Sequence, residues 1–93
     1  MNILVVDIGG THVKYLASGQ SERRKFASGP DLTPQQAVQS VLEGSQDWEF
    51  EAVTLAYPGP VLYNRLTAEP HNLGVGWLGF DFEAAFGRPV KLI

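Results

Sequence analysis

The sequence contains no cysteine and no long apolar run. The absence of cysteine among its 93 residues excludes disulfide frameworks and thiolate metal sites, and is compatible with a reducing compartment. No apolar run approaches the roughly 18 residues of a membrane span. The apolar start is interrupted by Asp7 and follows no basic segment, so no signal peptide is expected. We therefore expect a cytoplasmic protein that contacts no membrane.

Basic residues are also few. Seven Lys and Arg residues against ten Asp and Glu residues leave a formal net charge of −3. No basic stripe with interleaved aromatics is present, so nucleic acid is not an expected partner. Residues 23–25 form the one basic triplet. We interpret it as part of a solvated edge strand, and the less favoured alternative is that it binds a polyanionic phosphate donor. The length suits a single domain.

A glycine-centred turn is the feature around which the chain is organised. Residues 3–6 form a short β-branched run, which predicts a buried strand. Gly9 and Gly10 follow and can take the positive φ values of a tight hairpin turn. Alternating residues at 12–17 predict the returning strand. The start of the chain therefore reads as a β-hairpin.

The residue types around this turn are suited to phosphate. Backbone N–H groups of Gly9 and Gly10 can form an anion nest, Thr11 can add a hydroxyl and Lys14 a positive charge. Asp7, at the end of the first strand, can hold a hydrated Mg²⁺. An ordinary hairpin explains the glycine pair alone. It does not require the carboxylate, the hydroxyl or the ammonium.

The rest of the chain alternates strands and helices. Thr33 and Gln36 form a capping box with Pro34 at the first helical position. We expect a third strand at residues 22–27, a helix from Pro34 to a left-handed cap at Gly44, a fourth strand at 52–56, a small hairpin through Asn64, a short helix between Asp81 and Gly87, and a fifth strand at 89–93.

Two loops carry further candidate residues. Residues 57–60, Tyr-Pro-Gly-Pro, form a rigid loop after the fourth strand, where ligands bind in open α/β sheets, although a simple turn is the alternative. Residues 68–79 form a long irregular segment. Within it, His71 and Asn72 suit a hydroxyl-rich ligand, and a structural role is the alternative for the histidine. Trp77 can pack against a sugar ring or fill the core.

Four motifs follow one another along nearly the whole chain. They are Asp-Ile-Gly-Gly-Thr at 7–11, Tyr-Pro-Gly-Pro-Val at 57–61, Asn-Leu to Trp at 72–77 and Phe-Gly-Arg-Pro-Val at 86–90. In this order they resemble the start of a ROK-family sugar kinase, within the hexokinase and actin-like superfamily. The tyrosine-containing loop and the Thr-Pro helix start look most like the polyphosphate glucokinase branch. The sequence does not separate this branch from ATP-dependent glucokinases.

The resemblance implies a fold and a set of roles. The fold is α/β and ribonuclease-H-like, with a mixed five-stranded sheet in the order of three strands, helix, strand, helix and strand. The implied reaction transfers a phosphoryl group from ATP or polyphosphate, with Mg²⁺, to a hexose, and glucose is the expected sugar. The implied phosphate and metal residues are Asp7, Gly9, Gly10, Thr11 and Lys14. The implied sugar residues are Gly59, Pro60, His71 and Asn72. His12 receives no role, because this position varies in the family.

Other parts of the family pattern are absent. In the family, the strand equivalent to residues 89–93 runs into an Asn-Asp pair whose Asp is the general base, so we expect no catalytic residue before Ile93 and a base just after it. Residues 1–93 are then an N-terminal lobe that is inactive alone, because phosphoryl transfer needs groups from both sides of a cleft. The apolar patch left exposed predicts a homo-oligomer, with a domain-swapped dimer as one form.

Two other functions compete with this interpretation. One is a binding module without chemistry, a degenerate actin-like lobe that holds a phosphate or a sugar or pairs with another chain. The other is a ROK-type transcriptional repressor. Such repressors carry a helix-turn-helix before the phosphate hairpin, whereas Met1 lies two residues before the first expected strand. The repressor is therefore the less favoured of the two.

Overall fold

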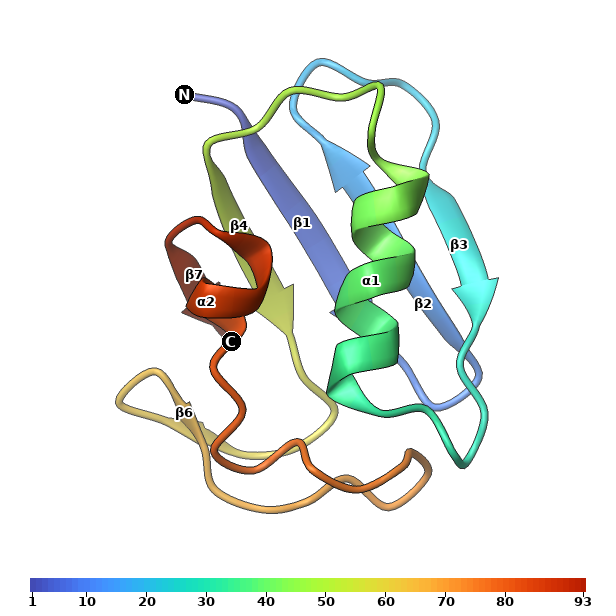
Figure 1. The fold of residues 1–93 in the computed structure, drawn as a ribbon, viewed down its shortest axis with the longest axis vertical. Coiled ribbons are helices and arrows are strands. Elements are labelled where there is room, and N and C mark those ends of the chain that lie inside the picture. The colour runs from blue at the N-terminus through green and yellow to red at the C-terminus, as the bar shows by residue number, and fades with distance from the viewer.

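The computed structural model describes all 93 residues and shows one mixed sheet with both helices on one face (Figure 1). The elements are β1 (Ile3–Ile8), β2 (His12–Ala17), β3 (Arg24–Ala27), α1 (Pro34–Gly44), β4 (Ala52–Ala56), β5 (Val61–Leu62), β6 (Arg65–Leu66), α2 (Phe82–Phe86) and β7 (Val90–Leu92). The five-stranded sheet has the order β3-β2-β1-β4-β7, and β5 and β6 form a separate two-stranded sheet. The expected ribonuclease-H-like arrangement is confirmed.

The central strand β1 sets the direction of the sheet. It pairs antiparallel with β2 and parallel with β4, and β4 pairs parallel with β7. Side chains alternate across β1, so that Leu4 and Val6 are fully buried beneath the helices while Val5 remains 48% exposed on the other face. The hydrophobic core therefore lies between the sheet and the two helices. Neither helix is long and apolar enough to span a bilayer.

Helix α1 begins as expected and ends differently. The Thr33 hydroxyl accepts from the Gln36 N–H, and the Gln36 side chain accepts from the Thr33 N–H, which completes the capping box. The expected left-handed cap at Gly44 is wrong, because Gly44 lies within the helix and Ser45 follows it with φ −117°. A Cβ at residue 44 would overlap with the Tyr15 hydroxyl. The glycine is thus needed for close packing of α1 on β2.

Strand β3 begins at Arg24, two residues later than expected, and the side chain of Arg24 contacts the connection that follows α1. The Arg24 guanidinium binds both carboxylate oxygens of Asp47, at 2.6 and 2.9 Å, and lies 4.0 Å from the centre of the Trp48 ring. The hydrogen bonds from Arg24 lower the pKa of the Asp47 carboxyl to about 2. One of the three basic residues at 23–25 is therefore part of the structure that closes this edge of the sheet.

The last third of the chain follows the expected order. Asp81 caps α2 by accepting from the Ala84 N–H at 3.0 Å, and Gly87 ends the helix with φ 69°. The hairpin of β5 and β6 turns through Tyr63 and Asn64, both with positive φ. Strand β7 is limited to Val90–Leu92, which is shorter than the expected range of 89–93.

We predict that Gly44→Ala destabilises the protein although alanine is the better helix former. Propensity alone favours the substitution by roughly 1 kcal/mol. The overlap with the Tyr15 hydroxyl should reverse this and lower the free energy of unfolding by about 1–3 kcal/mol. Urea unfolding measures the change.

The matched control adds Tyr15→Phe, which removes the overlapping hydroxyl. The double variant should recover part of the loss, whereas Gln39→Ala on the exposed side of α1 should change stability little. A Gly44→Ala protein as stable as the wild type would contradict the packing argument.

Candidate functional site

The turn between β1 and β2 is closed by backbone and side-chain hydrogen bonds. The Gly9 N–H donates to the His12 carbonyl at 2.9 Å, the Ser28 hydroxyl donates to the Gly9 carbonyl at 2.8 Å and the Ser28 N–H donates to the Thr11 carbonyl at 2.9 Å. The N–H groups of Gly10 and Thr11 donate to no backbone acceptor. Two adjacent donors of the turn are thus available to a ligand, whereas that of Gly9 is occupied.

The backbone conformation of the two glycines of the turn differs from the one expected. Positive φ was the expected reason for them, and neither Gly9 nor Gly10 has a positive φ, so this expectation is wrong. A Cβ at residue 9 would lie 2.7 Å from the His12 carbonyl oxygen. Gly9 is required because the returning strand comes so close to it. A Cβ at residue 10 would meet only ordinary contacts, the nearest at 3.4 Å.

Asp7 and Lys14 lie directly opposite each other across β1 and β2. Both face away from the buried side of the sheet, and they form no ion pair with each other. The Thr11 hydroxyl lies at the exposed turn, 3.3 Å from the Nδ1 atom of His12. A carboxylate, an ammonium and a hydroxyl are therefore accessible at or beside the turn. One exposed carboxylate suits a hydrated Mg²⁺, and no group of three or more His, Cys, Asp or Glu residues forms an all-protein metal cage.

The loop after β4 is fixed by Tyr57. This side chain is 7% exposed, and its hydroxyl donates to the Ala68 carbonyl at 2.9 Å. Burial, and secondly the charge of Glu69, raise the pKa of Tyr57 to about 12, so the phenol stays protonated and keeps its donor. Gly59 lies against the Tyr57 ring, and both Gly59 and Pro60 are exposed.

A single carboxylate shapes the irregular segment between β6 and α2. Glu69 accepts from the Trp77 N–H at 3.1 Å and from the Leu78 N–H at 2.9 Å. The Trp77 indole is fully buried and donates to the Leu32 carbonyl at 3.1 Å. Of the two roles considered for Trp77, the structure shows the core role. A buried indole presents no face to a sugar ring.

The segment places Asn72, an expected sugar residue, beside Gly10, an expected phosphate residue. Residues 67–80 run from the hairpin of β5 and β6 to the region below the start of α1 and then turn back toward α2 (Figure 1). Below the start of α1 the Asn72 side chain lies beside Gly10, since a Cβ placed on Gly10 would be 3.4 Å from the Asn72 Cβ atom. His71 and Asn72 are exposed. Gly59 and Pro60 follow β4, whose carboxyl end lies at the same edge of the sheet as that of β1 because β4 is parallel to β1.

Two residues that build this site were not identified from the sequence. Ser28 holds the glycine turn and Glu69 holds the irregular segment. Ser28 follows a strand in an ordinary Ser-Gly-Pro connection and gives no signal. Glu69 gives a weak one, because it is the only acidic residue between β6 and Asp81.

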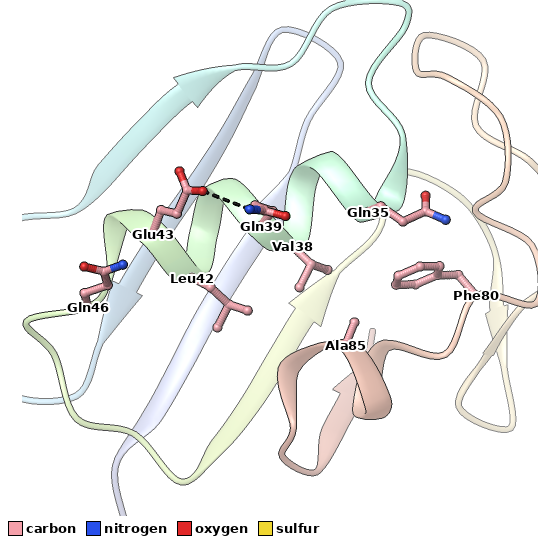
Figure 2. Close-up of a pocket in the computed structure, with 8 residues that line it drawn as sticks. All are labelled: Gln35, Val38, Gln39, Leu42, Glu43, Gln46, Phe80 and Ala85. Carbon is pink, nitrogen blue, oxygen red and sulfur yellow. Dashed lines mark hydrogen bonds between the residues drawn. The ribbon is translucent and has the colours of Figure 1, made fainter.

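A separate groove lies between the two helices and contains none of these residues. Its volume is about 530 Å³. Figure 2 shows Val38 and Leu42 of α1 on one side and Phe80 and Ala85 on the other, with the Gln39–Glu43 hydrogen bond of 3.0 Å along the outer face of α1. The groove belongs to the helix layer and is distinct from the candidate site.

The same fold occurs in solved structures of ROK proteins. A ROK hexokinase from Thermus thermophilus superposes with a TM-score of 0.75 and 23% identity over 100% of this chain and 35% of its own. A ROK family glucokinase from Streptomyces griseus in complex with glucose and AMPPNP superposes with a TM-score of 0.70 and 24% identity. The match covers 99% of this chain and 32% of the glucokinase. A ROK family protein from Streptococcus pneumoniae in complex with sucrose superposes with a TM-score of 0.75 and 18% identity. The match covers 99% of this chain and 34% of that protein.

These comparisons establish the fold of the chain. The chain spans about a third of the length of the solved structures it matches. No protein-family model matches the sequence, and no curated protein matches it. The architecture shared with these structures is the mixed five-stranded sheet with its helices.

We predict that Gly9→Ala and Gly10→Ala differ although the two residues are adjacent. Alanine at residue 9 would place its Cβ against the His12 carbonyl and force the turn open, at a cost of roughly 1–3 kcal/mol in unfolding free energy. Alanine at residue 10 should be nearly neutral. Thermal unfolding of both variants tests this. Equal losses would show that the turn does not depend on the close approach at residue 9.

Proposed function

We propose that residues 1–93 are the N-terminal lobe of a ROK-type sugar kinase, which transfers a phosphoryl group to a hexose hydroxyl. The observation that carries the proposal is the position of Asn72 beside Gly10 at the carboxyl edge of β1 and β4. Two free N–H groups, of a kind suited to an anion, and an amide of a kind suited to sugar hydroxyls thereby lie beside each other. The likeness of the fold to ROK kinases supports this assignment.

In this proposal each accessible group has one role. The free N–H groups of Gly10 and Thr11, with the Thr11 hydroxyl, bind phosphate, and Gly9 shapes the turn that presents them. Lys14 adds positive charge. Asp7 holds Mg²⁺ through water, and the ion would offset charge on the transferred phosphoryl group.

The sugar is bound by the loops at the same edge. His71 and Asn72 offer donors and acceptors to its hydroxyl groups, and Gly59 and Pro60 border it. Glucose is the proposed hexose. ATP or polyphosphate is the proposed donor, and the Streptomyces griseus glucokinase structure, which contains glucose and AMPPNP, supports ATP.

The proposed setting is a cytoplasmic kinase whose second lobe and general base lie outside residues 1–93. One lobe lacks the proposed general base for the attacking hydroxyl and the groups that would contact the phosphoryl group from the other side of the cleft. It should therefore not catalyse the reaction. A homo-oligomer, domain-swapped or not, stays a prediction that light scattering at tens of micromolar, the range where apolar association is expected, can test.

We predict that glucose and Mg·AMPPNP bind weakly to this chain at the turn and at Asn72. In NMR titrations, amide shifts should concentrate at residues 9–11 and 71–72. Asn72→Ala should reduce the glucose response, and Lys14→Ala should reduce the nucleotide response.

The chain offers a matched control for each variant. Asn2 precedes β1 at the end opposite to the turn, and Lys91 is an exposed lysine on β7, three strands away from Lys14 in the sheet. Asn2→Ala and Lys91→Ala should leave both responses unchanged. Shifts confined to the groove between α1 and α2 would refute the proposed site.

We further predict that the purified 93-residue protein shows no Mg²⁺-dependent phosphorylation of glucose with either donor in a coupled assay. Turnover by this chain would refute the assignment of the chemistry to two lobes. Ligand binding without turnover is the expected combination.

A further inference from the structure

Strand β7 is the outermost strand of the sheet beyond β4, and it is only three residues long. A short edge strand leaves a row of outward backbone groups without partners unless other parts of the chain bind them. In this structure the outward groups from the Val90 N–H to the Leu92 N–H are bound by side chains. The Val90 N–H donates to the Glu83 carboxylate at 3.1 Å, and the next two groups bind one residue, Asn64.

The Asn64 carboxamide makes two hydrogen bonds to β7. Its Nδ2 atom donates to the Val90 carbonyl at 3.1 Å, and its Oδ1 atom accepts from the Leu92 N–H at 2.7 Å. In a parallel ladder, one residue of a neighbouring strand donates to the carbonyl before its partner and accepts from the N–H after it. The side chain of Asn64 reproduces this pattern around Lys91.

Asn64 is held in place by the turn in which it lies. Tyr63 and Asn64 are the two central residues of the hairpin of β5 and β6, with φ values of 52° and 57°. Asparagine tolerates this left-handed conformation better than most residues. The hairpin follows directly from residues 57–60 at the end of β4. The carboxamide therefore joins the loop after β4 to the carboxyl end of β7.

We propose that the Asn64 side chain takes the place of one residue of a sixth strand. It fixes the carboxyl end of β7 relative to the loop at residues 57–60, and it closes the edge of the sheet to pairing with another strand. Since β7 is parallel to β4, this end lies at the edge that carries the candidate site. The inference concerns the geometry of that edge and stands or falls independently of sugar or phosphate binding.

Amide exchange measured by NMR on the whole 93-residue chain tests the proposal. In the wild type, the Leu92 N–H and one Nδ2 proton of Asn64 should exchange slowly. Asn64→Gly keeps the left-handed turn and removes the carboxamide, so exchange at Leu92 should accelerate about tenfold or more, with little change at core amides such as Leu55. Amide signals of Gly59 and Leu62 should shift together with those of Lys91 and Leu92.

Two further variants separate the carboxamide from the turn. Asn64→Asp keeps an acceptor for the Leu92 N–H and loses the donor to the Val90 carbonyl, so protection at Leu92 should be retained in large part. Tyr63→Gly changes the other left-handed residue, whose side chain is 89% exposed, and should leave Leu92 protected.

Three results would overturn the proposal. The first is unchanged exchange at Leu92 in Asn64→Gly. The second is equal acceleration in Tyr63→Gly, which would assign the effect to the turn. The third is fast exchange of both Nδ2 protons in the wild type, a measurement that stays decisive even if the glycine variant does not fold.

Discussion

The parallel pairing of β1 with β4 and of β4 with β7 is the constraint on which the rest of the structure depends. Parallel strands end at the same edge, so the glycine turn, the loop after β4 and the end of β7 are neighbours although they are distant in sequence. Between two parallel strands the chain must return to the edge of the sheet where the first strand began. Helices α1 and α2 make these returns, and both lie on one face of the sheet. The irregular loops that carry the candidate site lie together at one edge of the sheet.

Local signals in the sequence predicted the regular elements well. The capping box at Thr33, the Asp81 cap and the left-handed Gly87 depend on neighbours within a few residues, and all three occur as expected. The prediction of a left-handed cap at Gly44 was wrong, because a glycine near the end of a helix has two possible explanations. One is a left-handed cap, and the other is close packing against a distant residue. Only the second involves Tyr15, and no local pattern reveals it.

The candidate site was predictable by residue type and not by arrangement. Asp7, Thr11 and Lys14 stood out because a hairpin does not require them, and the structure places all three at or beside the turn. The contact between Asn72 and Gly10 depends on the course of the segment after β6, which contains no helix or strand. The roles of Ser28 and Glu69 were not predicted, because both residues bind backbone groups and many polar side chains can do so.

In the irregular segment between β6 and α2, side chains form the hydrogen bonds to backbone groups that neighbouring strands form elsewhere in the sheet. Glu69 binds two N–H groups, Tyr57 binds one carbonyl and Trp77 binds another, so polar groups in and around the irregular chain are satisfied without a strand. Removing one partner of a buried hydrogen bond costs about 1–3 kcal/mol, a large fraction of the stability of a small domain. The position of Asn72 beside Gly10 therefore depends on residues outside the candidate site. The geometry of the candidate site is set as much by Glu69 and Tyr57 as by the residues that form it.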